Sequence, residues 1–173
     1  MYQNLLSVRE AMHLYLRDPL TDIFNRRGFE QHYVEMMDAS KKDGVTLAIV
    51  SIDMDDLKEI NDRLGHQHGD AAICGMANAL SSALHEGEVC ARIGGDEFEA
   101  ILRMDTPGRI EEFKKALEEA LKKVNEAVSE AYVVGASVGI CVVNQPATMA
   151  EYMHRADVLM YEEKKRRHGE IKE

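Results

Sequence analysis

The sequence predicts an α+β domain in which helices cover a central sheet, with a β-hairpin set between two longer strands. Segments of helical periodicity alternate along the chain with two apolar runs that are long enough to be buried strands. Two shorter apolar runs, residues 89–93 and 98–102, flank Gly94 and Gly95, which indicate a tight hairpin turn because glycine reaches positive φ without strain. The 173 residues, 45% of them hydrophobic, suffice for one domain with its own core.

The chain begins with a predicted helix over residues 1–16. Its apolar residues are spaced three and four apart, as in a coiled-coil seam: Leu5, Val8, Met12 and Tyr15. Two interpretations stay open, a seam that pairs with another helix and an amphipathic helix that lies on its own domain. Arg17 to Asp22 then breaks the helix at Pro19, so we expect a separate helix over 1–16 and a domain over 17–173. A chain that opens inside a helix also fits a piece of a longer protein.

The first half of the domain centres on one buried strand. After a loop through Asn25 to Gly28, a helix is expected over 29–42, and a nearly continuous apolar run over 45–54 predicts a central strand buried on both faces. Asp53 ends that strand. A short helix over 57–64, a polar loop over 65–70 and a longer helix follow, and Asp70 stands where the N-cap of that helix would be.

The second half repeats the alternation of helix and strand. Thr106 and Pro107 predict the start of a helix that runs to about residue 124, followed by a strand over 132–143. One face of that strand carries small residues, which favours close approach by a backbone or a ligand: Gly135, Ser137, Gly139 and Cys141. A last helix over 148–163 leads to a basic segment, residues 164–168, whose cations either complement the helix dipole or bind phosphate.

The composition excludes several classes of protein. A net charge of −10 argues against a nonspecific nucleic-acid binder, and means that a polyanionic substrate would need metal ions and a local basic patch. Three scattered cysteines without CxxC spacing indicate thiols of a reducing compartment. With neither a secretory signal nor an apolar run of about 18 residues, we expect a cytoplasmic protein, or the cytoplasmic part of a larger one, with no membrane insertion of this segment.

The spacing of polar residues suggests one site. Asp53 at a strand end and Asp96 at the hairpin tip meet if their strands are neighbours, and two carboxylates with a backbone carbonyl are ligands that Mg²⁺ uses when it also holds phosphates. Lys58 and the basic segment would supply charge for a triphosphate, and Asn61 with Asp70 would read a base. The simpler interpretation of Asp96 and its neighbour is a solvated turn.

His66 and His68 lie two residues apart, a spacing that could bind a transition metal. The signal is weak, because the sequence offers them no cysteine or acidic partners at ligand spacing. Hydrogen bonds within their loop are the favoured interpretation.

Several motifs in one order make this chain similar to the GGDEF-domain diguanylate cyclases, over residues 17–168. Residues 18–21 and 25–27 resemble the family's D-P-L-T and N-R-R, with Asp22 where the family has glycine. Residues 53–62 resemble its D-x-D-x-F-K-x-x-N-D, and residues 65–70 its G-H-x-x-G-D. Residues 92–98 match the signature hairpin, residues 137–140 the S-x-G-I strand, and residues 156–164 the A-D-x-A-L-Y-x-A-K ending.

This resemblance implies a palm-like fold with a mostly antiparallel central sheet, kin to nucleotidyl cyclases. It also implies the condensation of two GTP into cyclic di-GMP with release of two pyrophosphates. It implies Mg²⁺ (or Mn²⁺) held by Asp53, the carbonyl of Met54, Asp96 and Glu97. Asp96 would also be the base for the 3′-hydroxyl, Glu97 would assist at the metals, and Lys58 would stabilise the reacting phosphate. Substrate contacts would come from Asn61 and Asp70 (guanine), His66 (beside the nucleotide), Lys164 (triphosphate), and Gly94 and Gly95 of the hairpin.

The same resemblance implies partners. One domain holds one GTP, and each 3′-hydroxyl must attack the other nucleotide, so two domains must face each other as a homodimer. The helix over 1–16 would then present the two halves under control of an upstream sensory module. The alternatives are a non-catalytic GTP-binding or cyclic di-GMP-binding GGDEF module that signals by conformation, and a cyclase of altered purine choice. Asp70 argues against the last, because a carboxylate pairs with guanine donors.

Two departures from the family pattern concern phosphate and product binding. Many members carry an inhibitory R-x-x-D product site before the hairpin, and the matching residues here are His85 and Glu88. Loss of the bidentate guanidinium predicts weak or absent product inhibition there. His168 also replaces an arginine that contacts phosphate in the family, with Arg166 or Arg167 as substitutes.

Overall fold

The structure is a computed structural model that describes residues 11–128, 132–167 and 169. Its elements are α2 (Arg26–Asp43), β1 (Leu47–Asp55), α3 (Leu57–Leu64), α4 (His66–Ser82), β2 (Val89–Gly94), β3 (Glu97–Arg103), α5 (Arg109–Ala127), β4 (Gly135–Val142) and α6 (Met149–Arg167). The four strands form one sheet in the order β2-β3-β1-β4, and every neighbouring pair is antiparallel. The predicted α+β fold with an antiparallel sheet is confirmed.

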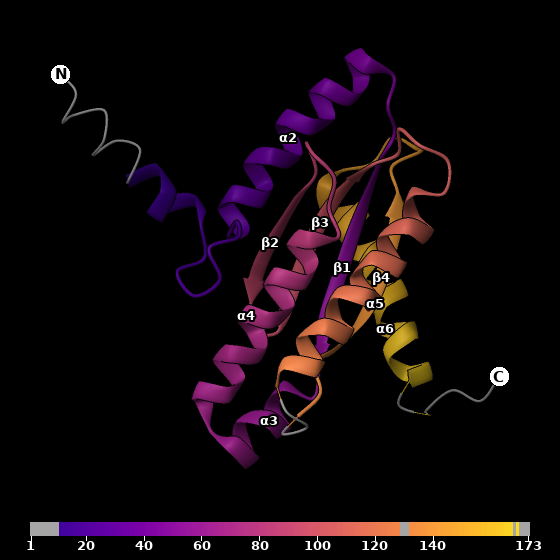
Figure 1. Ribbon diagram of the computed structural model, residues 1–173. Coiled ribbons are helices and arrows are strands. Elements are labelled where there is room, and N and C mark those ends of the chain that lie inside the picture. Colours follow the sequence, from indigo (N-terminus) through magenta and orange to yellow (C-terminus); the bar gives the residue numbers. More distant parts are fainter. Residues whose placement is uncertain (1–10, 129–131, 168, 170–173) are drawn as a thin grey trace.

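Helices cover both faces of this sheet, and β1 lies between the two layers (Figure 1). Ala48, Val50 and Ile52 of β1 belong to the core that includes residues of α3, α4 and α5, whereas Leu47 and Ile49 belong to the core beneath α2 and α6. Alternate residues of a strand point to opposite faces. The nearly continuous apolar run of β1 therefore reflects burial on both faces.

The small-residue face of β4 is covered by the backbone of α6. A Cβ atom added to Gly139 would lie 2.0 Å from the carbonyl oxygen of Ala156 and 2.2 Å from the amide nitrogen of Met160. Glycine is thus required for the helix to approach this closely. The sequence predicted close approach to this face by a backbone or a ligand, and in the structure the α6 backbone approaches it.

Two helices begin earlier than the sequence pattern predicts. α2 starts at Arg26 and not at Phe29, because the Asn25 side chain caps it by accepting a hydrogen bond from the N–H of Gly28 at 3.0 Å. α4 starts at His66, directly after Gly65. Gly65 has a φ of 89°, and this single residue separates α3 from α4. Residues 66–70 of the expected polar loop are therefore helical, and the interpretation of Asp70 as an N-cap is wrong.

Other bounds shift for local reasons. α5 begins at Arg109, after Gly108 in the left-handed region (φ 81°), so Thr106 and Pro107 precede it. β4 begins at Gly135 and not at residue 132, because the Asn125 side chain pairs with Val134: its amide donates to the carbonyl at 3.0 Å and its oxygen accepts from the N–H at 2.7 Å. β1 runs over Leu47–Asp55 instead of 45–54, and α6 continues through the basic residues to Arg167.

Residues 11–16 are helical, and Met12 and Tyr15 on this segment are exposed. Leu5 and Val8 lie outside the described residues, so the coiled-coil seam stays a prediction. None of the helices in the described part of the chain combines the length and the apolar character that a membrane crossing requires.

Candidate active site

One edge of the sheet gathers the predicted acidic residues. Asp53, near the end of β1, lies directly opposite Glu97, the first residue of β3. The N–H of Met54 donates to the carbonyl of Asp96 at 2.9 Å, which fixes the hairpin turn beside β1. In Figure 1 this is the lower edge, where β1 ends, the hairpin turns and α6 ends. The structure thus brings Asp53, Asp96 and Glu97 together because β1 and β3 are neighbours.

The hairpin turn is held from the N-terminal side of the domain. Gly95 takes a positive φ of 40°, and Arg92 donates to its carbonyl from Nε (3.0 Å) and Nη2 (2.9 Å). The same guanidinium pairs with Asp18 at 3.3 Å, and Asp18 accepts a hydrogen bond from the Thr21 hydroxyl at 2.7 Å. Burial raises the pKa of Asp18, but Thr21 and Arg92 outweigh it and lower the pKa below its usual value. These contacts of Arg92 with Gly95 and Asp18, the Arg92 clamp, were not predicted from the sequence, although Asp18 and Arg92 both lie in family motifs.

Lys164 of α6 reaches the acidic edge and hydrogen-bonds the Asp53 carboxylate. Burial, with the nearby charges of Asp96 and Asp55, raises the pKa of Asp53 despite the contact with Lys164. The pKa of Lys164 is raised in turn, because the hydrogen bond and charge of Asp53 outweigh the effect of burial. The edge is therefore a set of close carboxylates that attracts a cation.

Asp55 is a further acidic residue of this edge that the site prediction omitted. Its carboxylate accepts a hydrogen bond from the Ser137 hydroxyl at 3.0 Å and lies 3.7 Å from a guanidinium nitrogen of Arg167. The signal was present in the sequence, because residues two apart on a strand share a face. Asp53 and Asp55 had to point the same way once β1 was extended to Asp55.

The junction of α3 and α4 holds the two residues predicted to read a base. Gly69 lies in the first turns of α4, and a Cβ atom there would meet Asn61 Oδ1 at 2.0 Å. Asn61 therefore packs against the backbone next to Asp70, which is exposed. Asn61 and Asp70, the two residues predicted to read a base, therefore lie at the same junction.

The remaining predicted residues surround this junction. Lys58, in the first turn of α3, and His66, the first residue of α4, are both exposed. His68 Nδ1 lies 2.9 Å from the carbonyl of Leu64, as expected for a histidine that hydrogen-bonds locally. His168 of the basic segment lies outside the described residues.

The oxygen ligands at the acidic edge suit a hard cation. Asp53 and Asp96 offer carboxylate oxygens and Met54 a carbonyl, the donors that Mg²⁺ takes while keeping waters or phosphates in its shell. Among residues 11–128, 132–167 and 169, no group of three or more His, Cys, Asp or Glu side chains is arranged to hold a metal. A metal here would need ligands beyond protein side chains, such as the carbonyl, water and substrate.

The family model for "Diguanylate cyclase, GGDEF domain" matches residues 15–170. This chain belongs to the GGDEF family. It is 31% identical over 150 residues to diguanylate cyclase DgcP of Escherichia coli, covering 86% of this chain and 44% of DgcP. It is 28% identical over 166 residues to the cyclic di-GMP phosphodiesterase NbdA of Pseudomonas aeruginosa, covering 92% of this chain and 21% of NbdA.

Solved structures agree with the family assignment. The fold matches that of diguanylate cyclase SiaD of Pseudomonas aeruginosa, solved in complex with its activator SiaC, with a TM-score of 0.81 and 28% identity over 95% of this chain and 65% of that chain. This GGDEF domain spans less than half the length of DgcP and about a fifth of NbdA.

Glu88, which stands at the position of the aspartate in the family's R-x-x-D product site, has a structural role in this GGDEF domain. The Glu88 carboxylate receives two hydrogen bonds from Arg109, at 2.9 and 2.5 Å, and one from the N–H of Arg103 at 2.9 Å. Both side chains are buried, at 1% exposure for Glu88 and 0% for Arg109. Burial raises the pKa of Glu88, but these hydrogen bonds outweigh it and lower the pKa. The carboxylate is fully engaged inside the domain, and His85 instead lies 3.3 Å from Glu112.

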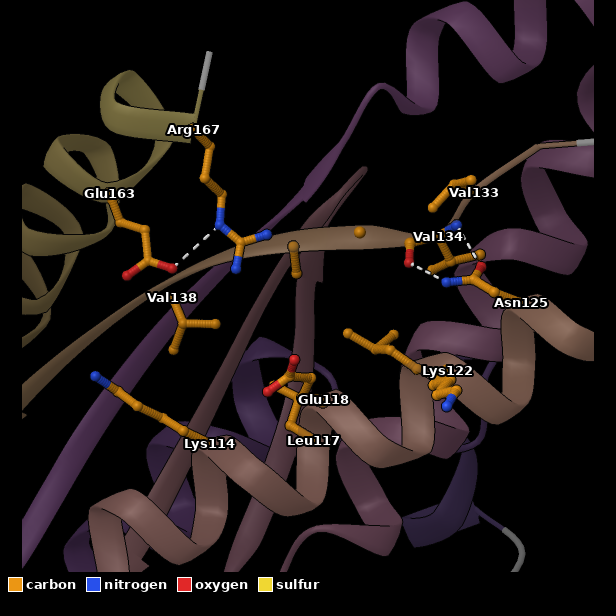
Figure 2. A pocket seen from close by; sticks show the side chains of 13 residues that line it. Lys114, Leu117, Glu118, Lys122, Asn125, Val133, Val134, Val138, Glu163 and Arg167 are labelled. Atoms are coloured by element: carbon orange, nitrogen blue, oxygen red, sulfur yellow. Dashed lines mark hydrogen bonds and ion pairs between the residues drawn. The ribbon is translucent and has the colours of Figure 1, made fainter. Parts of the chain in front are cut away.

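A cavity of about 690 Å³ lies beside the acidic edge of the GGDEF domain, between α5, β4 and α6 (Figure 2). Its lining includes the apolar side chains of Leu117, Leu121 and Val138, together with charged side chains of α5 and α6. Arg167, a candidate for phosphate contact, lines it, whereas Asp53, Asp96 and Lys164 do not. It approaches the candidate active site at Gly135, where an added Cβ atom would lie 3.1 Å from Asp55 Oδ2, and at Arg167, which pairs with Glu163 at 3.2 Å and lies 3.7 Å from Asp55.

Proposed function

We propose that this GGDEF domain is a diguanylate cyclase that condenses two GTP into cyclic di-GMP and two pyrophosphates. The observation that supports it most is the juxtaposition of Asp53 and Asp96 at one sheet edge, with Lys164 against them. Phosphoryl transfer needs mainly positioning and neutralisation of charge, and this edge supplies both kinds of group.

The proposed metal ligands are Asp53, the Met54 carbonyl and Asp96, with Glu97 assisting. A bound Mg²⁺ (or Mn²⁺) would neutralise phosphate charge and orient the α-phosphate for in-line attack. Asp96 takes the proton of the attacking 3′-hydroxyl. The new bond joins O3′ to the α-phosphorus, the bond from that phosphorus to the β-phosphate oxygen breaks, and pyrophosphate leaves with its electron pair.

Two lysines are proposed to handle the phosphates. Lys164 exchanges its contact with Asp53 for the triphosphate when nucleotide and metal arrive, and Lys58 stabilises charge on the reacting phosphate. Gly94 and Gly95 leave the hairpin open to close approach, because a Cβ at either position would meet nothing within 4 Å. His66 lies beside the nucleotide.

Asn61 and Asp70 are proposed to select guanine. The Asp70 carboxylate accepts from the N1–H and N2–H₂ donors of guanine, and the Asn61 amide faces its acceptors. Their neighbouring positions at the α3–α4 junction support this assignment. Adenine would place its N1 acceptor opposite the carboxylate, so the site disfavours ATP as a substrate.

The reaction requires two domains. Each 3′-hydroxyl attacks the α-phosphate of the nucleotide held by the other copy, so a two-fold homodimer is proposed, with the helix before residue 17 and an upstream sensory module controlling it. The activator in the SiaD structure supports control of such domains by partners. We infer that the domain works in the cytoplasm.

A second candidate is a non-catalytic GGDEF module that binds GTP and signals by conformation. It is favoured by the similarity to NbdA, which is named for cyclic di-GMP breakdown. The intact hairpin carboxylates Asp96 and Glu97 favour the cyclase instead.

The test is product analysis by chromatography after incubation with GTP and Mg²⁺. We expect cyclic di-GMP and pyrophosphate from the wild-type chain, and a loss of at least about 100-fold in Asp96→Asn, since the proposed base and metal ligand is neutralised. Asp38→Asn, on the exposed side of α2, is the matched control and should stay active. GTP binding without product in every variant would favour the non-catalytic module.

A further inference from the structure

A second cavity, of about 300 Å³, lies between the sheet and α6, on the face that α2 also covers. Residues of α2, β1, β2, β3 and α6 line it. It shares Glu97 with the candidate active site, but Asp53, Asp96 and Lys164 do not line it. It is therefore a separate recess behind the hairpin.

Glu99 is the unusual residue of this cavity. It lies in the middle of β3, opposite Ser51 of β1 and Ala91 of β2, and only 8% of it is exposed. Its Oε2 atom is buried and has no hydrogen-bond partner among the described residues. A buried carboxylate without a donor is costly, and native proteins almost always supply one. Glu99 lines a cavity that is large enough for a small molecule.

The charges around Glu99 define what that molecule must carry. From α2 the facing charged groups are Arg26 and Glu30, from β3 Glu97, and from α6 His154 and Asp157. The neighbours on β1 and β2 are uncharged. Carboxylates thus outnumber the single arginine, whose charge acts on Glu99 without forming an ion pair with it among the described residues.

We propose that this cavity binds a small organic cation, a guanidinium or primary ammonium compound, with Glu99 as its acceptor. A guanidinium suits the site best, because its planar donors match a carboxylate and it stays charged at every physiological pH. A metal ion is a poorer occupant, since the described residues hold no cluster of three metal-ligating side chains. The ligand would supply the donor that the fold itself withholds from Glu99.

The test is calorimetric titration of the whole chain with n-butylguanidinium, with n-butylurea as the neutral probe of the same shape. We expect the guanidinium to bind at least about tenfold more tightly than the urea, and at least about tenfold more weakly to Glu99→Gln than to the wild type. Asp38→Asn should bind as the wild type does. Equal binding of both probes, binding unchanged in Glu99→Gln, or no binding at low-millimolar probe would overturn the proposal. None of these readouts uses cyclase activity.

Discussion

Glu88 and Glu99 are both buried carboxylates, yet their surroundings shift their pKa values in opposite directions. Glu88 is met by Arg109 and two backbone N–H groups, which lower its pKa. Glu99, eleven positions further along the chain, has an oxygen with no donor among the described residues, and burial raises its pKa to about 8. Burial is common to both, so the hydrogen bonds decide the protonation state.

Glu99→Gln should change how stability depends on pH. The Glu99 pKa rises from 4.5 in the unfolded reference to about 8 in the fold. Between these values the folded chain holds a proton that the unfolded chain has lost, so the free energy of unfolding falls as pH rises. The wild type should lose up to about 1.4 kcal/mol per pH unit relative to Glu99→Gln across this window.

Urea denaturation of both chains at pH 5, 6, 7 and 8 measures this difference. Because all other titrating groups are shared, the comparison isolates Glu99. Parallel curves for the two chains would show that Glu99 titrates as an exposed carboxyl does.

At the scale of elements, close packing depends on glycines that the sequence marks only indirectly. Gly139→Ala should destabilise the fold by at least about 3 kcal/mol, because its Cβ would meet the α6 backbone at 2.0 and 2.2 Å and neither element can yield cheaply. Gly94→Ala, where a Cβ meets nothing within 4 Å, is the matched control. Denaturant midpoints test both, and a Gly139→Ala variant within about 0.5 kcal/mol of the wild type would refute the packing account.

Gly69→Ala should weaken binding of GTP by about tenfold or more, a loss of roughly one hydrogen bond. The new Cβ would displace Asn61, whose Oδ1 lies 2.0 Å from that position. Gly75→Ala on the same helix is the control, because its Cβ instead meets the side chain of Val124 at 2.8 Å, away from the site. Titration with GTP and Mg²⁺ separates them, and equal affinities would place Asn61 outside the base site.

The sequence predicts most elements because each has a local cause. The apolar run of β1 and the paired glycines of the hairpin identified the sheet correctly, and the neighbouring strands brought Asp53 to Asp96. The predicted bounds of an element were wrong where a single side chain determines its first residue, as Asn25 does for α2 and Asn125, bonded to Val134, does for β4. The Arg92 clamp and the Glu88–Arg109 pair join residues 74 and 21 positions apart, and no local pattern contains such contacts.

At the scale of the whole molecule, the candidate active site lies along one edge of the sheet. β1 and the hairpin bring the carboxylates there, α6 brings Lys164, and the α3–α4 junction brings Asn61 and Asp70. A chain of net charge −10 repels a free triphosphate, so binding of GTP should need a divalent cation. One such edge serves one nucleotide, which makes association of two chains part of the proposed mechanism.

The most direct measurement is the initial rate of cyclic di-GMP formation from GTP and Mg²⁺ as a function of chain concentration. We predict a rate that rises faster than linearly below the dissociation constant of the pair, and linearly above it. Fusing a strong parallel coiled coil before residue 11 should raise the rate at low concentration. Absence of cyclic di-GMP at every concentration, with and without the fused coil, would contradict the catalytic account.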